Sequence, residues 1–157
     1  MNAKLPPGPE VLVKDHPTCK STNRCKHCPC IDRSGFVYSR STHRKFKCIF
    51  NGCCQSKNLI YCITCPHCGL QYVGQTKTSL MTRINNHRST IRTGKDLPLP
   101  THMKTHDDLE PRLKIHILQY IKSDPDSLEA KESRDMAERD WMARLNTLVP
   151  NGMNLQE

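Results

Sequence analysis

The stretch from residue 58 to residue 87 constrains the fold most, because a strand pattern changes there into a helix pattern. Two apolar runs, LIYCI at 59–63 and LQYV at 70–73, are rich in residues that favour strands. The segment between them, CPHCG at 65–69, contains the Pro and Gly that are typical of a tight connection. The sequence therefore predicts a hairpin that leads into a helix.

The helix is predicted directly after the second apolar run. Four residues recur there at helical spacing: Leu80, Ile84, His87 and Ile91. We expect Thr76 or Thr78 to cap the start of this helix and Gly94 to end it. Arg83 and His87 lie four positions apart and therefore share a face. Such a pair is usually solvated on a basic helix, but here it follows two strand tyrosines.

The connection of the hairpin is itself a metal-binding motif. Cys65 and Cys68 are separated by two residues, so that their thiolates can bind one Zn²⁺. Pro66 fixes the entry into the turn, and Gly69 can adopt the positive φ that lets backbone N–H groups approach the sulfurs. Two merely structural thiols would explain neither Pro66 nor Gly69. We therefore expect a zinc knuckle in the hairpin.

The other ligands of this zinc are expected from a second short helix, which begins within residues 97–106. His102 and His106 lie at i and i+4 and present both imidazoles on one side. We predict that they complete the site begun by Cys65 and Cys68. The metal would then hold this helix against the tip of the hairpin.

The charge of the chain favours a polyanionic partner. Lys and Arg number 24 against 15 Asp and Glu, which gives a formal charge of +9. Nucleic acid is the simplest such partner, and the alternative is a basic protein without one. Ten cysteines occur among histidines at short spacings, without an apolar signal segment, which favours zinc in a reducing compartment over disulfides. No run approaches the roughly 20 apolar residues of a membrane span, so no membrane partner is expected.

Three segments are predicted along the chain: an irregular, proline-bearing leader over 1–18, a Cys-rich basic module over 19–57, and a main domain over 58–157 that begins with the hairpin. The Cys-rich module contains a second knuckle, Cys25 and Cys28. Cys48 with either Cys53 or Cys54 is the simplest completion of a second zinc site, and we take Cys54. The alternative ligands are Cys19, Cys30, His27 and His43.

Short strands are expected at 35–39 and 44–50, the second with alternating basic residues. These residues either form a charged edge that discourages aggregation or contact phosphate. A further strand is predicted over 112–121, with Gln119 on the face of its apolar residues and His116 on the outer face.

The last helix is expected to begin at Asp126, with Glu129 completing a capping box. Its predicted apolar stripe consists of Leu128, Met136, Trp141, Met142 and Leu145.

Two tripeptides in these strands resemble a known family. LIY at 59–61 and YVG at 72–74 are similar to the motifs that name the GIY-YIG nucleases, and Arg83 and His87 follow at the family's distance. Leu59 departs from the pattern, which has glycine there. The Cys-x-x-Cys between the tripeptides resembles the version found in the endonuclease domain of Penelope-like retroelements. The resemblance implies an α/β (α+β) fold with a small, three-stranded, mostly antiparallel sheet flanked by helices, preceded here by the Cys-rich zinc-bound extension.

The resemblance also implies the roles of the site residues. Tyr61 would act as general base on the attacking water, with His87 accepting its proton and Arg83 lowering the phenol pKa and bracing the phosphate. Tyr72 would orient water or phosphate. Glu138, three residues before a tryptophan, would hold one Mg²⁺ or Mn²⁺.

Two further residues receive roles from the family. Asn154, in the closing turn, would support the site. His102 has a competing role as the active-site histidine that related nucleases place after the first helix, but that role would leave His106 unexplained.

The function expected from this resemblance is endonucleolytic nicking of double-stranded DNA, which exposes a 3′-OH primer for reverse transcription and retroelement integration. A reverse transcriptase domain of the same full-length protein, its RNA template and a nuclear location are the expected context. The residues expected to contact DNA are Arg44, Lys45, Lys47, Lys77, Arg83, Arg88 and Arg92.

Two other functions fit parts of the sequence. A non-catalytic, zinc-dependent nucleic-acid-binding module fits the composition equally well, but it does not explain the order of the six nuclease-like residues. A zinc-built protein-interaction module of the cross-brace kind is disfavoured, because residues 107–157 contain no cysteine.

Overall fold

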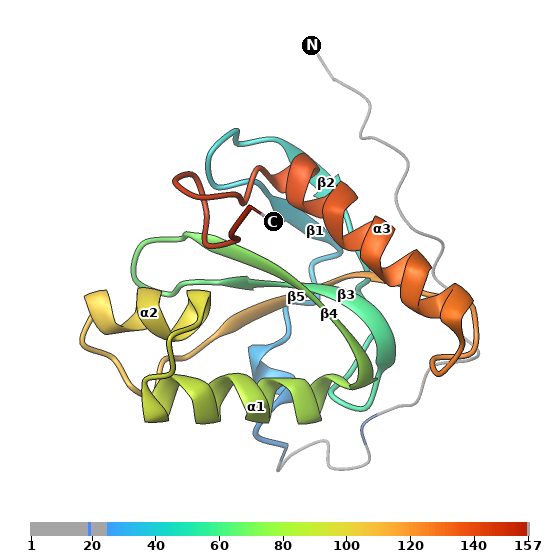
Figure 1. Ribbon diagram of the computed structural model, residues 1–157, viewed down its shortest axis with the longest axis horizontal. Coiled ribbons are helices and arrows are strands. Elements are labelled where there is room, and N and C mark those ends of the chain that lie inside the picture. Colours follow the sequence, from blue (N-terminus) through green and yellow to red (C-terminus); the bar gives the residue numbers. More distant parts are fainter. Residues whose placement is uncertain (1–18, 20–24, 157) are drawn as a thin grey trace.

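The computed structural model describes residues 19 and 25–156, so the leader predicted for residues 1–18 lies outside the described residues. The elements follow in this order (Figure 1): the 3-10 turn η1 (Cys28–Cys30), β1 (Phe36–Tyr38), β2 (Lys45–Lys47), β3 (Lys57–Thr64), β4 (Gln71–Ser79), α1 (Leu80–Thr93), α2 (Pro98–Thr105), β5 (Lys114–Tyr120) and α3 (Leu128–Leu145). Among the described residues, no helix is long and apolar enough to cross a membrane.

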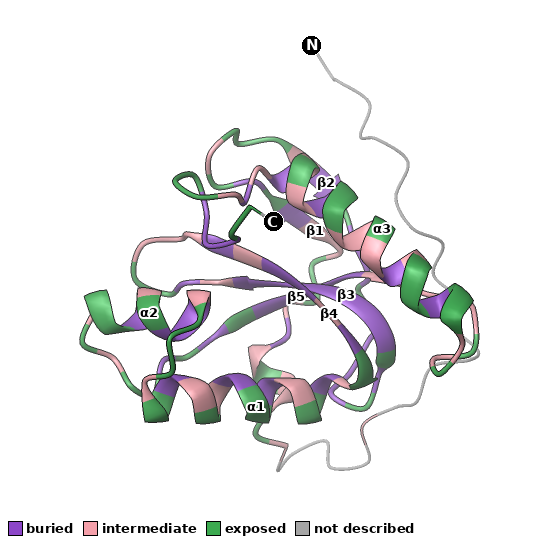
Figure 2. Ribbon diagram, in the orientation of Figure 1, coloured by how far each residue is buried: buried purple, intermediate pink, exposed green. Residues whose placement is uncertain are grey.

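The centre of the fold is a three-stranded antiparallel sheet with the order β4-β3-β5. β3 is the middle strand and is buried from Asn58 to Ile63 (Figure 2). Its register places Tyr61 opposite Gly74 on β4 and opposite Ile117 on β5. Helices cover both faces of this sheet, which confirms the predicted mixed α/β class and three-stranded sheet.

Each face of the sheet has its own apolar core. Side chains at alternate positions of β3 point to opposite faces, and both faces are apolar, which makes β3 a continuous hydrophobic run. On one face Tyr61 and Ile63 pack with residues of α1 and α2, namely Leu80, Ile84, Ile91, Leu99 and Met103. On the other face Ile60 and Cys62 pack with Trp141 and Leu145 of α3.

The predicted start and end of α1 had different outcomes. The N-cap is Ser79, whose side chain accepts a hydrogen bond from the Thr82 amide, and not Thr76 or Thr78. Thr76 and Thr78 bond to each other at the end of β4. Gly94 ends the helix, as predicted, and it adopts the left-handed conformation that glycine takes readily.

The residues before β3 pack onto this core. β1 and β2 form an antiparallel hairpin, and Val37 and Phe46 from it enter the core beneath α3. Ile31 and Ile49 form isolated bridges with Ile115 and Ile117, along the edge of β5 that β3 leaves open. This edge of the sheet is therefore covered by the amino-terminal segment.

The strand predicted over 112–121 is β5, but the face predicted for Gln119 was wrong, because a bulge interrupts the strand. Ile60 lies opposite Gln119 and Tyr61 opposite Ile117, so Leu118 is the extra residue. Gln119 consequently faces α3, where its side chain accepts a hydrogen bond from Trp141 Nε1. His116 is buried rather than on an outer face, with Nε2 lying 3.6 Å from Asp32 Oδ1.

Two predictions for α3 were also wrong. Its N-cap is Ser127, which accepts a hydrogen bond from the Ala130 amide, instead of Asp126. Leu128 and Met136 are each 70% exposed, whereas Arg134 is buried. Only the second half of the predicted apolar stripe therefore contacts the core.

Candidate active site and metal-binding clusters

Three of the predicted site residues meet between β3 and α1. Tyr61 points from the middle strand towards α1, and its Oη lies 2.6 Å from His87 Nε2. Arg83 donates a hydrogen bond from Nε to the same oxygen at 3.1 Å. Because Arg83 and His87 lie one helical turn apart, both side chains reach one phenol.

The edge strand β4 leaves room for this phenol. A Cβ atom placed on Gly74 would lie 2.5 Å from Tyr61 Oη, so only glycine fits opposite the ring. Tyr72, two residues before Gly74, lies on the same face of β4, and its ring packs edge-on against His87. The second tripeptide therefore supplies both a phenol and the space for the first one.

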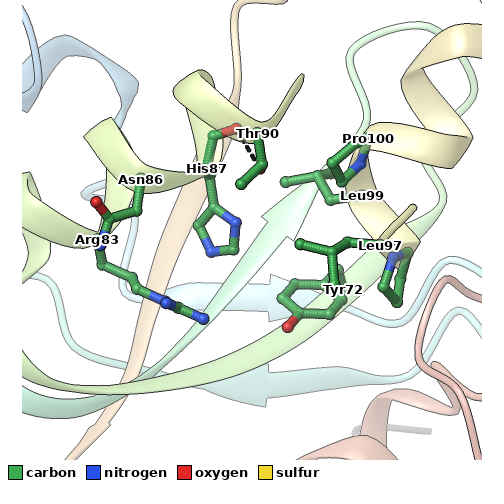
Figure 3. Close-up of a pocket in the computed structure, with 9 residues that line it drawn as sticks. Tyr72, Arg83, Asn86, His87, Thr90, Leu97, Leu99 and Pro100 are labelled. Atoms are coloured by element: carbon green, nitrogen blue, oxygen red, sulfur yellow. Dashed lines mark hydrogen bonds between the residues drawn. The ribbon is translucent and has the colours of Figure 1, made fainter. Parts of the chain in front are cut away.

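A cavity of about 130 Å³ opens beside these groups. Figure 3 shows Arg83 and His87 extending into it from α1, with Tyr72 opposite them. The remaining wall comes from Asn86 and Thr90 of α1 and from residues 97–100, where α2 begins. A phosphate group placed in this cavity would meet a guanidinium, an imidazole and a phenol.

The protonation states of the site follow from burial. Burial raises the pKa of Tyr61 well above its usual value, although the charge of Arg83 lowers it. The net direction is thus opposite to the lowering expected from Arg83 alone. Burial and the charge of Arg83 lower the pKa of His87 to about 4. At neutral pH the imidazole is therefore uncharged and the phenol keeps its proton.

Glu138 approaches the site from α3, on the other face of the sheet. Its Oε2 accepts a hydrogen bond of 2.5 Å from Gln75 Nε2, one residue after Gly74 on the edge strand. The negative charge of Glu138 contributes to the raised pKa of both Tyr61 and Tyr72. The carboxylate is therefore within electrostatic reach of both phenols, around the edge that β4 forms.

Asn154 pairs with the backbone of β4. Its Oδ1 accepts a hydrogen bond from the Val73 amide at 2.8 Å, and its Nδ2 donates to the Val73 carbonyl at 2.9 Å. Thr147 Oγ1 donates a further hydrogen bond to Oδ1. Asn154 thus takes the place of a neighbouring strand and holds Val73 between Tyr72 and Gly74.

Comparison with known families decides the relationship of the chain. The model of the GIY-YIG catalytic domain matches residues 57–147, which are 91 of the 157 residues. The chain belongs to the GIY-YIG family. Domains of this family are typically nucleases and generally use divalent metal ions. Neither a curated protein nor a solved structure matches the chain.

This GIY-YIG domain has a cluster of metal-ligand atoms at the tip of its central hairpin. One ligand atom each from Cys65, Cys68, His102 and His106 lies within 4.8 Å of the other three. Cys68 Sγ lies 3.3 Å from His102 Nε2, which lies 3.3 Å from His106 Nε2. Gly69 has φ +80°, and the His67 amide donates to Cys65 Sγ, as expected of a knuckle. Two thiols and two imidazoles are a donor set that fits Zn²⁺.

A second cluster, in the segment before the GIY-YIG match, consists of Cys19, Cys25, Cys28 and Cys54, whose sulfurs also lie within 4.8 Å of one another. The structure corrects the predicted ligand set here. Cys48 lies instead in the apolar core beneath α3, while Cys19 approaches Cys54 at 3.7 Å. Cys48 follows directly on β2, two residues after Phe46, and packs in the same core as Phe46.

The predicted DNA-contacting residues lie in two areas. Lys77, Arg83, Arg88 and Arg92 lie on or next to α1, where Arg92 is near Glu110 and Lys77 near Asp126. Arg44, Lys45 and Lys47 lie on or next to β2, with Lys45 Nζ 4.0 Å from the centre of the Phe36 ring.

Sequence reasoning missed three residues next to the site: Asn58, Gln75 and Arg134. A glutamine after the second tripeptide and an arginine on a charged helix carry no local signal of burial. Only the position of α3 on β4 shows that Arg134 is buried and bonded to Gln75 and Asn58.

Proposed function

We propose that this chain is a metal-dependent DNA endonuclease that hydrolyses a phosphodiester bond. The observation that supports it most is the triad of Tyr61, His87 and Arg83, in which both α1 side chains bond to one phenol beside a cavity. A phenol that can take a proton from water, an imidazole that can accept one, and a fixed positive charge can together promote phosphodiester hydrolysis.

The proton path follows from the protonation states. The attacking water gives its proton to Tyr61 Oη while Tyr61 passes its own proton to His87 Nε2, 2.6 Å away. Because burial keeps the phenol protonated, Tyr61 relays a proton and is not a phenolate before the reaction begins. The neutral imidazole, with its pKa lowered to about 4, is free to receive it. Arg83 stays charged throughout and stabilises the negative charge that develops on the phosphate.

Glu138 is the proposed ligand of one Mg²⁺ or Mn²⁺. A carboxylate oxygen is the type of ligand that these ions prefer. Bound there, the ion would neutralise charge on the leaving 3′-oxygen. Glu138 itself, held by Gln75, supplies the negative charge that attracts the ion to this edge of the sheet.

Structural Zn²⁺ is proposed for both clusters, because thiolates favour this ion over Mg²⁺. At Cys65, Cys68, His102 and His106 the ion would hold α2 against the hairpin, and α2 begins at the wall of the active-site cavity. This assignment uses both histidines, whereas a catalytic role of His102 would use one. At Cys19, Cys25, Cys28 and Cys54 it would hold the segment that precedes β3.

The wider context is proposed from the sequence. The basic residues around α1 and β2 would bind duplex DNA through its phosphates, with an affinity that falls as salt rises. The cleavage would be a nick whose 3′-OH primes reverse transcription by a domain of the same full-length protein on its RNA template, in the nucleus. The Cys-x-x-Cys between the two tripeptides is the feature that supports this retroelement context.

A plasmid assay tests the activity. Supercoiled plasmid is incubated with Mg²⁺ and either the wild type, Tyr61→Phe or Glu138→Ala, beside the matched surface controls Tyr38→Phe and Glu129→Ala. We expect nicking by the wild type and both controls only. Equal nicking by all five proteins would point to a contaminant. DNA binding without nicking by any of them would favour a non-catalytic binding module.

A further inference from the structure

Gln75 connects the edge strand to two carboxylates of α3. Its Nε2 donates hydrogen bonds to Asp135 Oδ1 at 2.8 Å and to Glu138 Oε2 at 2.5 Å. A side-chain amide nitrogen carries two hydrogens, so both are used. The amide group of Gln75 therefore fixes the position of the Glu138 carboxylate relative to β4.

Arg134 determines which way round the Gln75 amide lies. Its Nε donates to Gln75 Oε1 at 3.3 Å. Because a guanidinium can only donate, the oxygen of the amide must face Arg134 and the nitrogen must face the carboxylates. Arg134 is only 5% exposed, and its Nη1 donates to Asn58 Oδ1 at 2.6 Å and to the Pro125 carbonyl at 3.1 Å. The guanidinium is thus held on two sides.

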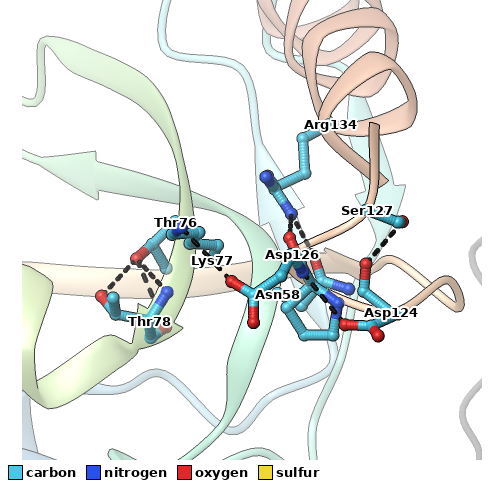
Figure 4. A network of polar contacts seen from close by, with 9 residues as sticks. Asn58, Thr76, Lys77, Thr78, Asp124, Asp126, Ser127 and Arg134 are labelled. Atoms are coloured by element: carbon cyan, nitrogen blue, oxygen red, sulfur yellow. Dashed lines mark hydrogen bonds and ion pairs between the residues drawn. The ribbon is translucent and has the colours of Figure 1, made fainter. Parts of the chain in front are cut away.

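Asn58 fixes the other end of this network. Its Nδ2 donates to the carbonyl oxygens of Ile121 and Ser123, at 3.0 Å and 2.8 Å. Carbonyls only accept, so the Asn58 amide cannot reverse either, and its oxygen remains the acceptor for Arg134. Figure 4 shows Arg134 descending from α3 onto Asn58, beside the loop that precedes the helix. Every hydrogen bond from Asn58 to Glu138 therefore has one possible direction.

We infer that Gln75 and Arg134 are positioning residues that hold the Glu138 carboxylate in the orientation in which it binds the divalent cation of the cleavage reaction. The inference rests on the proposed function. It adds that metal affinity depends on a hydrogen-bond network starting at the first residues of β3. Outer contacts of this kind keep a ligand in place, and their loss typically lowers metal affinity by about 10-fold to 100-fold.

Gln75→Met tests this inference, because methionine has a similar shape and cannot donate a hydrogen bond. The zinc-loaded protein is assayed for plasmid nicking over a range of Mn²⁺ concentrations. We expect the half-saturating Mn²⁺ concentration to rise by about tenfold or more, with the rate recovering at high Mn²⁺. Affinity for uncleaved duplex, measured by fluorescence anisotropy without divalent ions, should stay near the wild-type value, and circular dichroism should show a folded protein. Gln156→Met, at an exposed position, is the control and should change nothing.

Arg134→Lys provides a second measurement and should shift the half-saturating Mn²⁺ concentration in the same direction. An unchanged value in Gln75→Met would overturn the inference. A lower rate at every Mn²⁺ concentration with the same half-saturation would also overturn it, because that is the result of a purely structural role. Absence of both Mn²⁺ binding and cleavage in the wild type would instead overturn the proposed function, and this inference with it.

Discussion

The close approach of Tyr61 to Gly74 makes Gly74→Ala a sharp test of the site. The added methyl carbon would lie 2.5 Å from Tyr61 Oη and 2.6 Å from Cζ, and ordinary contact begins at 3.4 Å. The ring must therefore move by about 0.9 Å, the difference between 3.4 Å and 2.5 Å. It is only 1% exposed and bonded to His87 and Arg83, so this movement breaks the triad.

Two magnitudes follow from this displacement. Crowding a packed core costs about 1–3 kcal/mol of folding stability, which a domain with about 5–15 kcal/mol tolerates. Misplacing a reacting group by about 1 Å can lower the rate about 100-fold. We therefore expect Gly74→Ala to fold, to melt at a lower temperature, and to nick plasmid about 100-fold more slowly than the wild type.

The assay combines initial nicking rates with thermal unfolding followed by circular dichroism. Ile60→Val is the control, because Ile60 faces the opposite core and its truncation costs about 0.5–1.5 kcal/mol without crowding the phenol. It should lose stability and keep its nicking rate. A Gly74→Ala protein that cleaves as fast as the wild type would refute the placement of Tyr61 in the reaction.

Three further predictions follow. The pKa of His87 is lowered to about 4 from 6.5, so the folded state binds fewer protons than the unfolded chain. The free energy of unfolding, measured with urea, should therefore fall as the pH drops from 6.5 towards 4. In His87→Gln this free energy should fall less steeply over the same pH range. The side chain in Asn154→Asp cannot donate to the Val73 carbonyl, so the free energy of unfolding, measured by chemical denaturation, should be lower by about 2 kcal/mol or more. Metal analysis should find one Zn²⁺ fewer in Cys19→Ala and no change in Cys48→Ala.

The central hairpin and α1 could be predicted because their signals are local. Gly69 and Gly94 stand where the backbone adopts positive φ, and the apolar spacing of α1 matches its buried face. The bulge of β5 has no such signal: Leu118 looks like any alternating strand residue. The same pattern therefore predicted the strand correctly and the faces of its last residues incorrectly.

The errors in α3 and in the second metal cluster have a common cause, the dependence on tertiary position. Leu128 and Met136 look like core residues, but the first half of α3 lies at the edge of the sheet, where Arg134 is inserted towards β3. Cys19 and Cys48 are equally good ligands by residue type. Only the path of the chain brings Cys19 to the cluster and leaves Cys48 in the core.

The pairing of Asn154 with Val73 joins positions that are 81 residues apart in the sequence. During translation, β4 is therefore complete on the ribosome long before its outer partner exists. An unpaired strand edge can associate with other chains, so a chain that has not yet reached residue 154 lacks the side chain that covers Val73 on this edge.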